Sequence, residues 1–270
     1  MKKFKPIGIG IFILISGVGL GFLIAKFSAG ALLVPPTKIP KPAVNNGSEY
    51  ANRQPVSVDL TSLYPKEIFR FGNPNIKTLA LTFDDGPDSQ FTPKILDVLK
   101  KYNVKATFFV VGSQIEKYPE IFKRIIREGH AIGSHSYQHL NICRLSAAKI
   151  KFQLNKNQEL IQNNGGSALV YYRPPYGALD PTSIELISKN GYKIVLWTID
   201  SLDWRGFKKQ QVLANVVPKL KNGYIILQHC GTQTQKESLN GTVEALPGII
   251  ESAQRLGCRF TTIPELLKKS

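Results

Sequence analysis

Cysteine is scarce in this chain, and its spacing excludes two kinds of site. The three cysteines are Cys143, Cys230 and Cys258. None belongs to a C-x-x-C pair, which excludes a zinc knuckle, and none lies near the N-terminus, which excludes a lipid-modified start. An odd number leaves at least one thiol free. We expect unpaired, semi-buried thiols; a disulfide between Cys143 and Cys230 is the alternative, since each follows a histidine closely.

Acidic residues are also few, with 19 Asp and Glu against 35 Lys and Arg, so the formal net charge is +16. Such a surplus favours anionic surroundings, such as nucleic acid, anionic lipid or an acidic cell-wall polymer. The sequence has no cluster of basic residues interleaved with aromatics and no known nucleic-acid module. We therefore expect no binding to nucleic acid.

The N-terminal region has a long run without charge. Residues 7–25 are uncharged and mostly apolar, and they follow Lys2, Lys3 and Lys5. That length can span a bilayer as a helix, and the basic start would keep that end in the cytoplasm. We expect residues 1–31 to be a membrane anchor. The alternative is a signal peptide that is cleaved after a small-residue site at residues 29–31, which would leave a secreted protein. With either an anchor or a signal peptide, we expect the rest of the chain to lie outside the cytoplasm.

Two further segments are predicted. Residues 32–74 are rich in Pro, Asn and Lys and are expected to form a linker and lead-in. Residues 75–270 are expected to form the catalytic domain. In it, short apolar runs alternate with amphipathic stretches, which predicts parallel strands joined by crossover helices. The strands are expected at 78–83, 106–111, 131–133, 170–172, 193–197, 224–227 and 259–261. Helices are expected at 91–102, 118–128, 146–163, 180–191, 209–220, 242–255 and from Pro264 onward.

Histidine is rare too, and its placement is informative. Two of the four histidines, His135 and His139, are spaced i and i+4, which on a helical turn would put both on one face. Asp84 and Asp85 end the first predicted strand, and His229 ends another. One carboxylate with two imidazoles suits a metal ion that keeps an open position, and a second carboxylate can take a proton from water. Polar groups that follow parallel strands gather at one rim of an α/β fold.

Five segments, in order, resemble the NodB-type polysaccharide deacetylases, which form carbohydrate esterase family four. They begin at Thr82 (TFDDG), His135 (HSYQH), Arg173 (RPPYG), Asp200 (DSLDW) and Leu227 (LQH). The resemblance implies a distorted (β/α) barrel of about seven parallel strands. It also implies one divalent metal, usually zinc with cobalt or another ion as the alternative, and hydrolysis of acetamide groups on N-acetylated sugars.

The resemblance also implies a role for each matching residue. The metal ligands would be Asp85, His135 and His139. Asp84 would be the general base, held by Arg173, and His229 the general acid, oriented by Asp203 with Asp200 as the alternative. Tyr176 would offer a backbone N–H to the oxyanion, while Trp204 and Leu227 would enclose the acetyl methyl. Cys230 stands where many relatives have an acid. His130 and Trp197 are expected to be structural.

The expected function is that of a membrane-anchored, monomeric amidohydrolase acting on N-acetylglucosamine in an extracellular polysaccharide, with peptidoglycan as the first choice. Chitin oligomers, an exopolysaccharide and acetylated xylan are alternative substrates. Deacetylation of muramic acid is less expected, because both aspartates of the first motif are present. Two other classes are a non-catalytic wall-binding module and a metal-dependent phosphoesterase.

Overall fold

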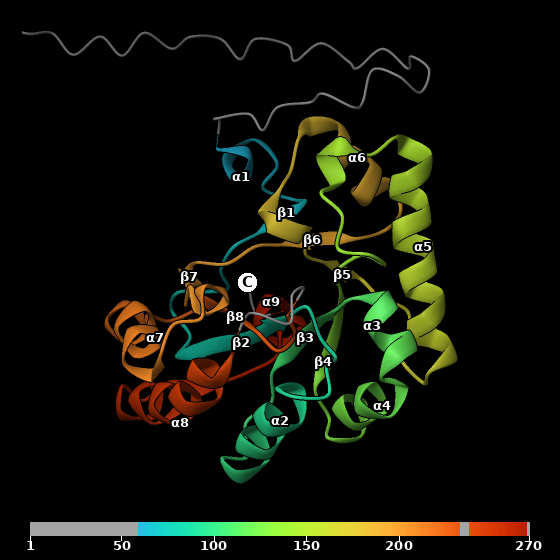
Figure 1. Ribbon diagram of the computed structural model, residues 1–270. Coiled ribbons are helices and arrows are strands. Elements are labelled where there is room, and N and C mark those ends of the chain that lie inside the picture. Colours follow the sequence, from blue (N-terminus) through green and yellow to red (C-terminus); the bar gives the residue numbers. More distant parts are fainter. Residues whose placement is uncertain (1–58, 233–237, 269–270) are drawn as a thin grey trace, which may run out of the picture. The chain divides into compact units, whose positions relative to one another are not determined.

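The computed structural model describes residues 59–232 and 238–268 (Figure 1). The predicted membrane anchor and most of the predicted linker lie outside these residues. Within them, no helix combines the length and apolar character needed to cross a bilayer.

The described chain alternates strands and helices, as predicted. The strands are β1 (Ile68–Phe69), β2 (Thr78–Asp84), β3 (Thr107–Val110), β4 (Ala131–Ser134), β5 (Tyr171–Tyr172), β6 (Lys193–Val195), β7 (Ile199–Asp200), β8 (Ile225–His229) and β9 (Arg259–Phe260). The α-helices are α1 (Leu60–Leu63), α2 (Thr92–Lys101), α3 (Gly112–Lys117), α4 (Pro119–Arg127), α5 (Ala147–Asn163), α6 (Pro181–Lys189), α7 (Lys209–Val216), α8 (Asn240–Arg255) and α9 (Ile263–Lys268).

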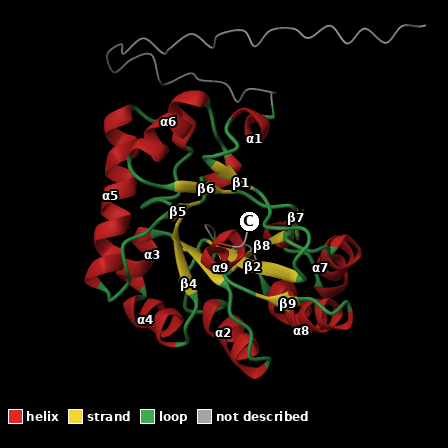
Figure 2. Cartoon of the chain, turned by 180° about the vertical axis from the view of Figure 1, so that it is seen from behind, coloured by secondary structure: helices red, strands yellow, loops and turns green. Residues whose placement is uncertain are grey.

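These strands form one curled, parallel sheet with helices around it (Figures 1 and 2). The order is β1-β6-β5-β4-β3-β2-β8-β7, and β9 pairs with the amino half of β2. Within the described residues no ladder joins β1 to β7, so the sheet is an open half-barrel rather than a closed barrel. The expectation of about seven strands missed β1 and β7, because it relied on strands that alternate with helices, and no helix separates β1 from β2 or β6 from β7.

Two of the predicted helices begin at a side-chain cap that the sequence displays. Ser146 caps α5, accepting from the Lys149 N–H, and Asp180 caps α6 through the Ser183 N–H, with Pro181 in the first turn. The short helix α3 was not predicted. It begins at Gly112, and its apolar face is a single buried residue, Ile115, which gives no amphipathic pattern.

The packing of the core leaves the carboxyl end of the sheet available for a site. Strand β2 is buried along its whole length, between the helices and the barrel interior. Inside the barrel, Phe109 and Ile225 pack with Ile263 and Leu266 of α9. The Ile263 N–H donates to the Thr107 hydroxyl at the start of β3 (2.8 Å), so α9 lies against the amino ends of the strands. Figures 1 and 2 show α9 at the centre of the curled sheet.

Candidate active site

A pocket of about 510 Å³ opens at the carboxyl ends of the strands. Eight of the ten predicted site residues line it, and the other two, Arg173 and Asp203, are buried behind it. A larger groove of about 790 Å³ holds none of these ten residues. The lining of the pocket consists of Asp84, Asp85, His135, His139, Pro174, Tyr176, Gly177, Trp197, Asp200, Trp204, Leu227 and His229.

A left-handed residue allows the two adjacent aspartates to share this pocket. Successive residues of a strand normally point to opposite faces. Strand β2 ends at Asp84, however, and Asp85 adopts φ +72°, which turns its side chain back toward the same cavity. The segment after β8 packs directly against this turn. The Cys230 N–H donates to the Asp84 carbonyl (2.9 Å), and a Cβ on Gly231 would collide with the Asp85 carbonyl.

The two histidines come from a loop and not from a helical turn, so that part of the prediction was wrong. His135 follows β4 directly, and both Ser136 and His139 have positive φ, at 67° and 56°. The loop curls on itself through a bond from the His139 N–H to the Ser136 hydroxyl (2.9 Å). Gln153 of α5 fixes it from outside with a bond to the Gln138 N–H and a second one to its side chain, both 2.8 Å.

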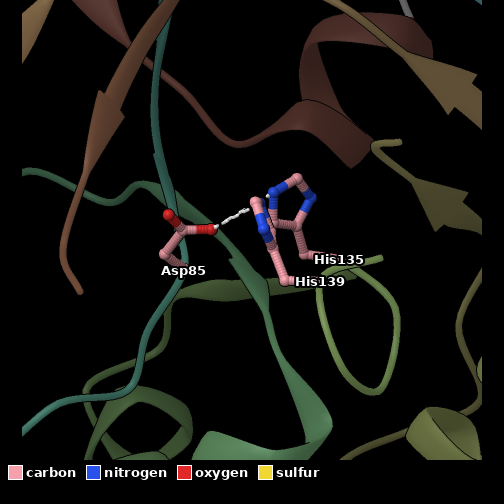
Figure 3. A group of neighbouring side chains, drawn as sticks. All are labelled: Asp85, His135 and His139. Carbon is pink, nitrogen blue, oxygen red and sulfur yellow. Dashed lines mark ion pairs between the residues drawn. The ribbon is translucent and has the colours of Figure 1, made fainter. Parts of the chain in front are cut away.

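Asp85, His135 and His139 form a group that fits a metal ion (Figure 3). Asp85 Oδ1 lies 3.3 Å from His135 Nε2 and 3.1 Å from His139 Nε2. This oxygen is buried and accepts no hydrogen bond within the described residues. His135 Nδ1 lies 2.7 Å from the Arg173 carbonyl, to which it can only donate, so in the neutral ring the lone pair is on Nε2. A cation would satisfy all three ligand atoms.

The expected charge states also suit a metal. Burial alone would raise the pKa of Asp85, but His135 and His139 outweigh it and lower this pKa to about 2. Burial, reinforced by the neighbouring His135, lowers the pKa of His139 to about 4. At neutral pH the group therefore offers an anionic carboxylate and an imidazole lone pair, which are the forms that bind metals.

Asp84 is fixed by a buried ion pair. Its Oδ1 lies 2.8 Å from Arg173 Nη1, and its Oδ2 lies 3.7 Å from His135 Nε2. Arg173 is fully buried and also donates to the Thr82 hydroxyl and to the carbonyls of Val195 and Leu196. Its guanidinium carbon lies 4.1 Å from the Phe109 ring centroid. The role of Thr82 was not foreseen, although this residue begins the first motif.

A second carboxylate–imidazole pair lies across the pocket. His229 Nδ1 donates to Asp203 Oδ1 (2.7 Å), and the His229 N–H donates to Asp203 Oδ2 (2.8 Å). Burial would lower the pKa of His229, but the charge and hydrogen bond of Asp203 outweigh it and raise this pKa to about 10. Asp200, the alternative partner, instead accepts from the Leu202 N–H (2.8 Å).

The rim of the pocket is aromatic. Tyr176 is 70% exposed, has φ +61° and contacts His139 edge to face, with 4.7 Å between the ring centroids. Its backbone N–H has no acceptor in the part of the chain that the structure describes. Trp204 is 48% exposed, and Leu227 is buried. Trp197, expected in the core, lines the pocket as well; its place after β6, one of the strands that end at this edge, was the missed signal.

The remaining predicted features lie outside the pocket. All three cysteines are buried and form no disulfide among the described residues, so the alternative of a disulfide between Cys143 and Cys230 was wrong. The Cys230 thiol contacts the Asp84 carbonyl oxygen (3.4 Å). His130 is buried, and its Nδ1 accepts from the Ala106 N–H (3.2 Å), which agrees with a structural role.

Comparison with known proteins identifies similar chains. A family model described as polysaccharide deacetylase matches residues 71–195. A peptidoglycan-N-acetylglucosamine deacetylase of Bacillus cereus is 41% identical over 206 residues, covering 76% of this chain and 74% of the relative. The peptidoglycan-N-acetylmuramic acid deacetylase PdaC of Bacillus subtilis is 37% identical over 194 residues, covering 72% and 39%. A crystal structure of a peptidoglycan N-acetylglucosamine deacetylase with a bound benzamide compound superposes with a TM-score of 0.74 at 38% identity, covering 79% and 98%.

The ligand group predicts the outcome of a metal-binding measurement. The wild-type chain, loaded with zinc and dialysed, should retain one zinc ion per chain. His135→Ala should retain almost none, because it removes an imidazole that the Arg173 carbonyl orients toward Asp85. His130→Asn, which changes a histidine outside the pocket, should retain zinc normally. Metal analysis of folded samples decides this, and a full zinc complement in His135→Ala would refute the ligand assignment.

Proposed function

The chain belongs to the polysaccharide deacetylase family, and on that premise we propose that it is a metal-dependent hydrolase of the acetamide of N-acetylglucosamine in an extracellular polysaccharide, foremost peptidoglycan. One observation carries the proposal. Asp84, paired with Arg173, and His229, paired with Asp203, both line the pocket that contains Asp85, His135 and His139.

Asp85, His135 and His139 would hold the metal. An amide is a poor electrophile, and a bound divalent ion supplies the Lewis acidity that polarises its carbonyl and acidifies water. Zinc is our first choice because a ligand set of one carboxylate and two imidazoles suits it, with cobalt or another divalent ion as the alternative.

Asp84 and His229 would divide the proton transfers between them. Asp84 takes a proton from the attacking water, whose oxygen bonds to the acetyl carbon. Arg173 occupies Asp84 Oδ1, which leaves Oδ2 for this proton. His229 then donates a proton to the sugar nitrogen as the C–N bond breaks, giving acetate and a free amine. Asp203 fixes the ring of His229 and stabilises its protonated form.

Four residues would accommodate the acetyl group itself. The N–H of Tyr176, which has no acceptor among the described residues, would donate to the oxyanion of the tetrahedral intermediate. Trp204 and Leu227 would enclose the methyl group, and Trp197 adds a further aromatic wall. The lining combines these apolar side chains with three carboxylates and three imidazoles, and such convergent polar groups beside aromatic walls are typical of a specific ligand site.

Peptidoglycan is favoured because relatives that act on it match this chain over most of its length, and because a basic protein suits an anionic cell wall. Residues 1–31 would anchor a monomer to the membrane, and residues 32–74 would hold its catalytic domain, 75–270, at a distance from the bilayer. A non-catalytic wall-binding role is disfavoured, since the base, the acid and all three ligands face one pocket.

Acetate release tests the reaction and the base together. With added zinc, the wild-type chain should release acetate from purified peptidoglycan faster than from chitin oligomers or acetylated xylan. Asp84→Asn should slow release by on the order of 10²- to 10⁴-fold, because an amide cannot accept the proton. Asp88→Asn is a matched control on the same loop, since Asn can still cap α2. Undiminished release by Asp84→Asn would eliminate the proposed base.

Substrates with different leaving groups distinguish the role of His229 as the acid from that of Asp84 as the base. His229→Ala should slow amide hydrolysis by on the order of 100-fold, because the departing amine must gain a proton. Hydrolysis of 4-nitrophenyl acetate should fall far less, since its leaving group departs as an anion. The measurement is kcat on both substrates for each protein. Equal losses on the two substrates would count against His229 as the acid.

A further inference from the structure

The Asp203 carboxylate accepts four hydrogen bonds, and one of them comes from a distant element. Oδ1 accepts from His229 Nδ1 (2.7 Å) and from the adjacent Trp204 N–H (2.9 Å). Oδ2 accepts from the His229 N–H (2.8 Å) and from the Thr242 hydroxyl (2.7 Å). Thr242 belongs to the first turn of α8 and is fully buried. Of the four donors, Thr242 alone lies outside both the turn that carries Asp203 and the strand that carries His229.

Both backbone groups of Asp203 are hydrogen-bonded within its own segment: the N–H donates to the Ser201 hydroxyl (3.4 Å), and the carbonyl accepts from the Gly206 N–H (2.9 Å). Asp203 begins a three-residue 3₁₀ turn that ends at Arg205, and the residue before it, Leu202, has φ +55°. A left-handed, non-glycine residue of this kind persists only where the surroundings impose it. The orientation of the Asp203 side chain nevertheless depends on donors outside this turn, because three of its four hydrogen bonds come from His229 and Thr242.

The amino end of α8 is built to approach this turn. A Cβ on Gly241 would collide with the Phe207 carbonyl, so only glycine allows the helix to lie directly against the chain there. The next residue is Thr242, whose hydroxyl thereby reaches Asp203 Oδ2. Because a carboxylate with two bonds on each oxygen cannot rotate freely, Oδ1 stays directed at the His229 ring.

We propose that Thr242 is a positioning residue for the proton donor: its hydroxyl locks the Asp203 carboxylate so that His229 presents its other ring nitrogen to the departing amine. The proposal rests on the proposed deacetylase function and adds to it a residue outside the five motifs. It assigns to α8 a part in the reaction beyond covering the sheet. Thr242 touches neither substrate nor metal in this role and acts only through Asp203.

Two substitutions separate the hydroxyl from the shape of the side chain. Thr242→Val keeps the volume, removes the donor and leaves Asp203 Oδ2 with a lost bond. Thr242→Ser keeps the donor and loses a methyl group. Loss of a hydrogen bond to a buried charged group predicts an approximately ten- to hundred-fold fall in kcat on the acetamide substrate for Thr242→Val. Thr242→Ser should stay within about threefold of the wild type.

Three measurements distinguish a positioning role of Thr242 from a merely structural one. Each is made on the full chain in detergent. First, Thr242→Val should lose more activity on the acetamide than on 4-nitrophenyl acetate. Second, adding Thr242→Val to Asp203→Ala should have no further effect on kcat, since the hydroxyl acts through the carboxylate. Third, the hydrogen-bonded Nδ1–H signal of His229 in proton NMR should persist in Thr242→Ser and shift or disappear in Thr242→Val and in Asp203→Ala.

The NMR readout needs no turnover, so the two proposals can fail separately. A wild-type chain that releases no acetate would refute the deacetylase function, while the His229 signal would still decide the role of Thr242. An unchanged Nδ1–H signal in Thr242→Val would overturn the role of Thr242. Equal losses on both substrates, or a full effect of Thr242→Val in the Asp203→Ala background, would overturn it as well.

Discussion

The fully buried guanidinium of Arg173 is the interaction on which the site depends. Its side chain pairs with Asp84 at the end of β2 and also bonds to carbonyls at and after β6, while its own carbonyl accepts from His135. One residue thereby orients the proposed base and one proposed metal ligand. Removing one partner of a buried ion pair typically costs about 3–5 kcal/mol, because the other charge remains desolvated and unpaired. The position of Arg173 therefore couples the stability of the half-barrel to the geometry of its open edge.

Backbone strain is concentrated at the same edge. Among the residues that the structure describes, six other than glycine have positive φ, and five of them belong to the segments that surround the pocket: Asp85, Ser136, His139, Tyr176 and Leu202. Each such conformation costs on the order of 1–3 kcal/mol and needs support from its surroundings. Here the support comes from hydrogen bonds such as those of Gln153 to the histidine loop and of Thr242 to Asp203. Positive φ values direct side chains to positions that a regular strand could not reach. At Asp85, for example, this conformation brings the side chain into the same pocket as that of Asp84.

The sequence could predict the parts of this molecule that repeat or that follow local rules. The alternation of apolar runs and amphipathic stretches predicts the parallel α/β architecture. Ser146 and Asp180 predict where the helices that they cap begin. The gathering of Asp84, His135 and His229 follows from their places at strand ends. The strands β1 and β7 were missed, because no helix separates β1 from β2 or β6 from β7 and the prediction relied on strands that alternate with helices. The loop conformation of His135 to His139 was also missed, since the i, i+4 spacing equally fits a helical turn. Trp197 could have been placed at the site from its position at a strand end, whereas Thr242 belongs to no motif, and only the tertiary structure brings it to Asp203.

The proposed metal centre depends on one buried carboxylate oxygen, Asp85 Oδ1, that lies between two imidazoles without a hydrogen-bond partner among the described residues. Anomalous diffraction at the zinc edge, from crystals of the zinc-loaded protein, can locate the ion. We expect a single strong peak bounded by the side chains of Asp85, His135 and His139, beside Asp84 and across the pocket from His229. A peak elsewhere, or an Asp85 carboxylate turned away from the ion, would contradict this proposal.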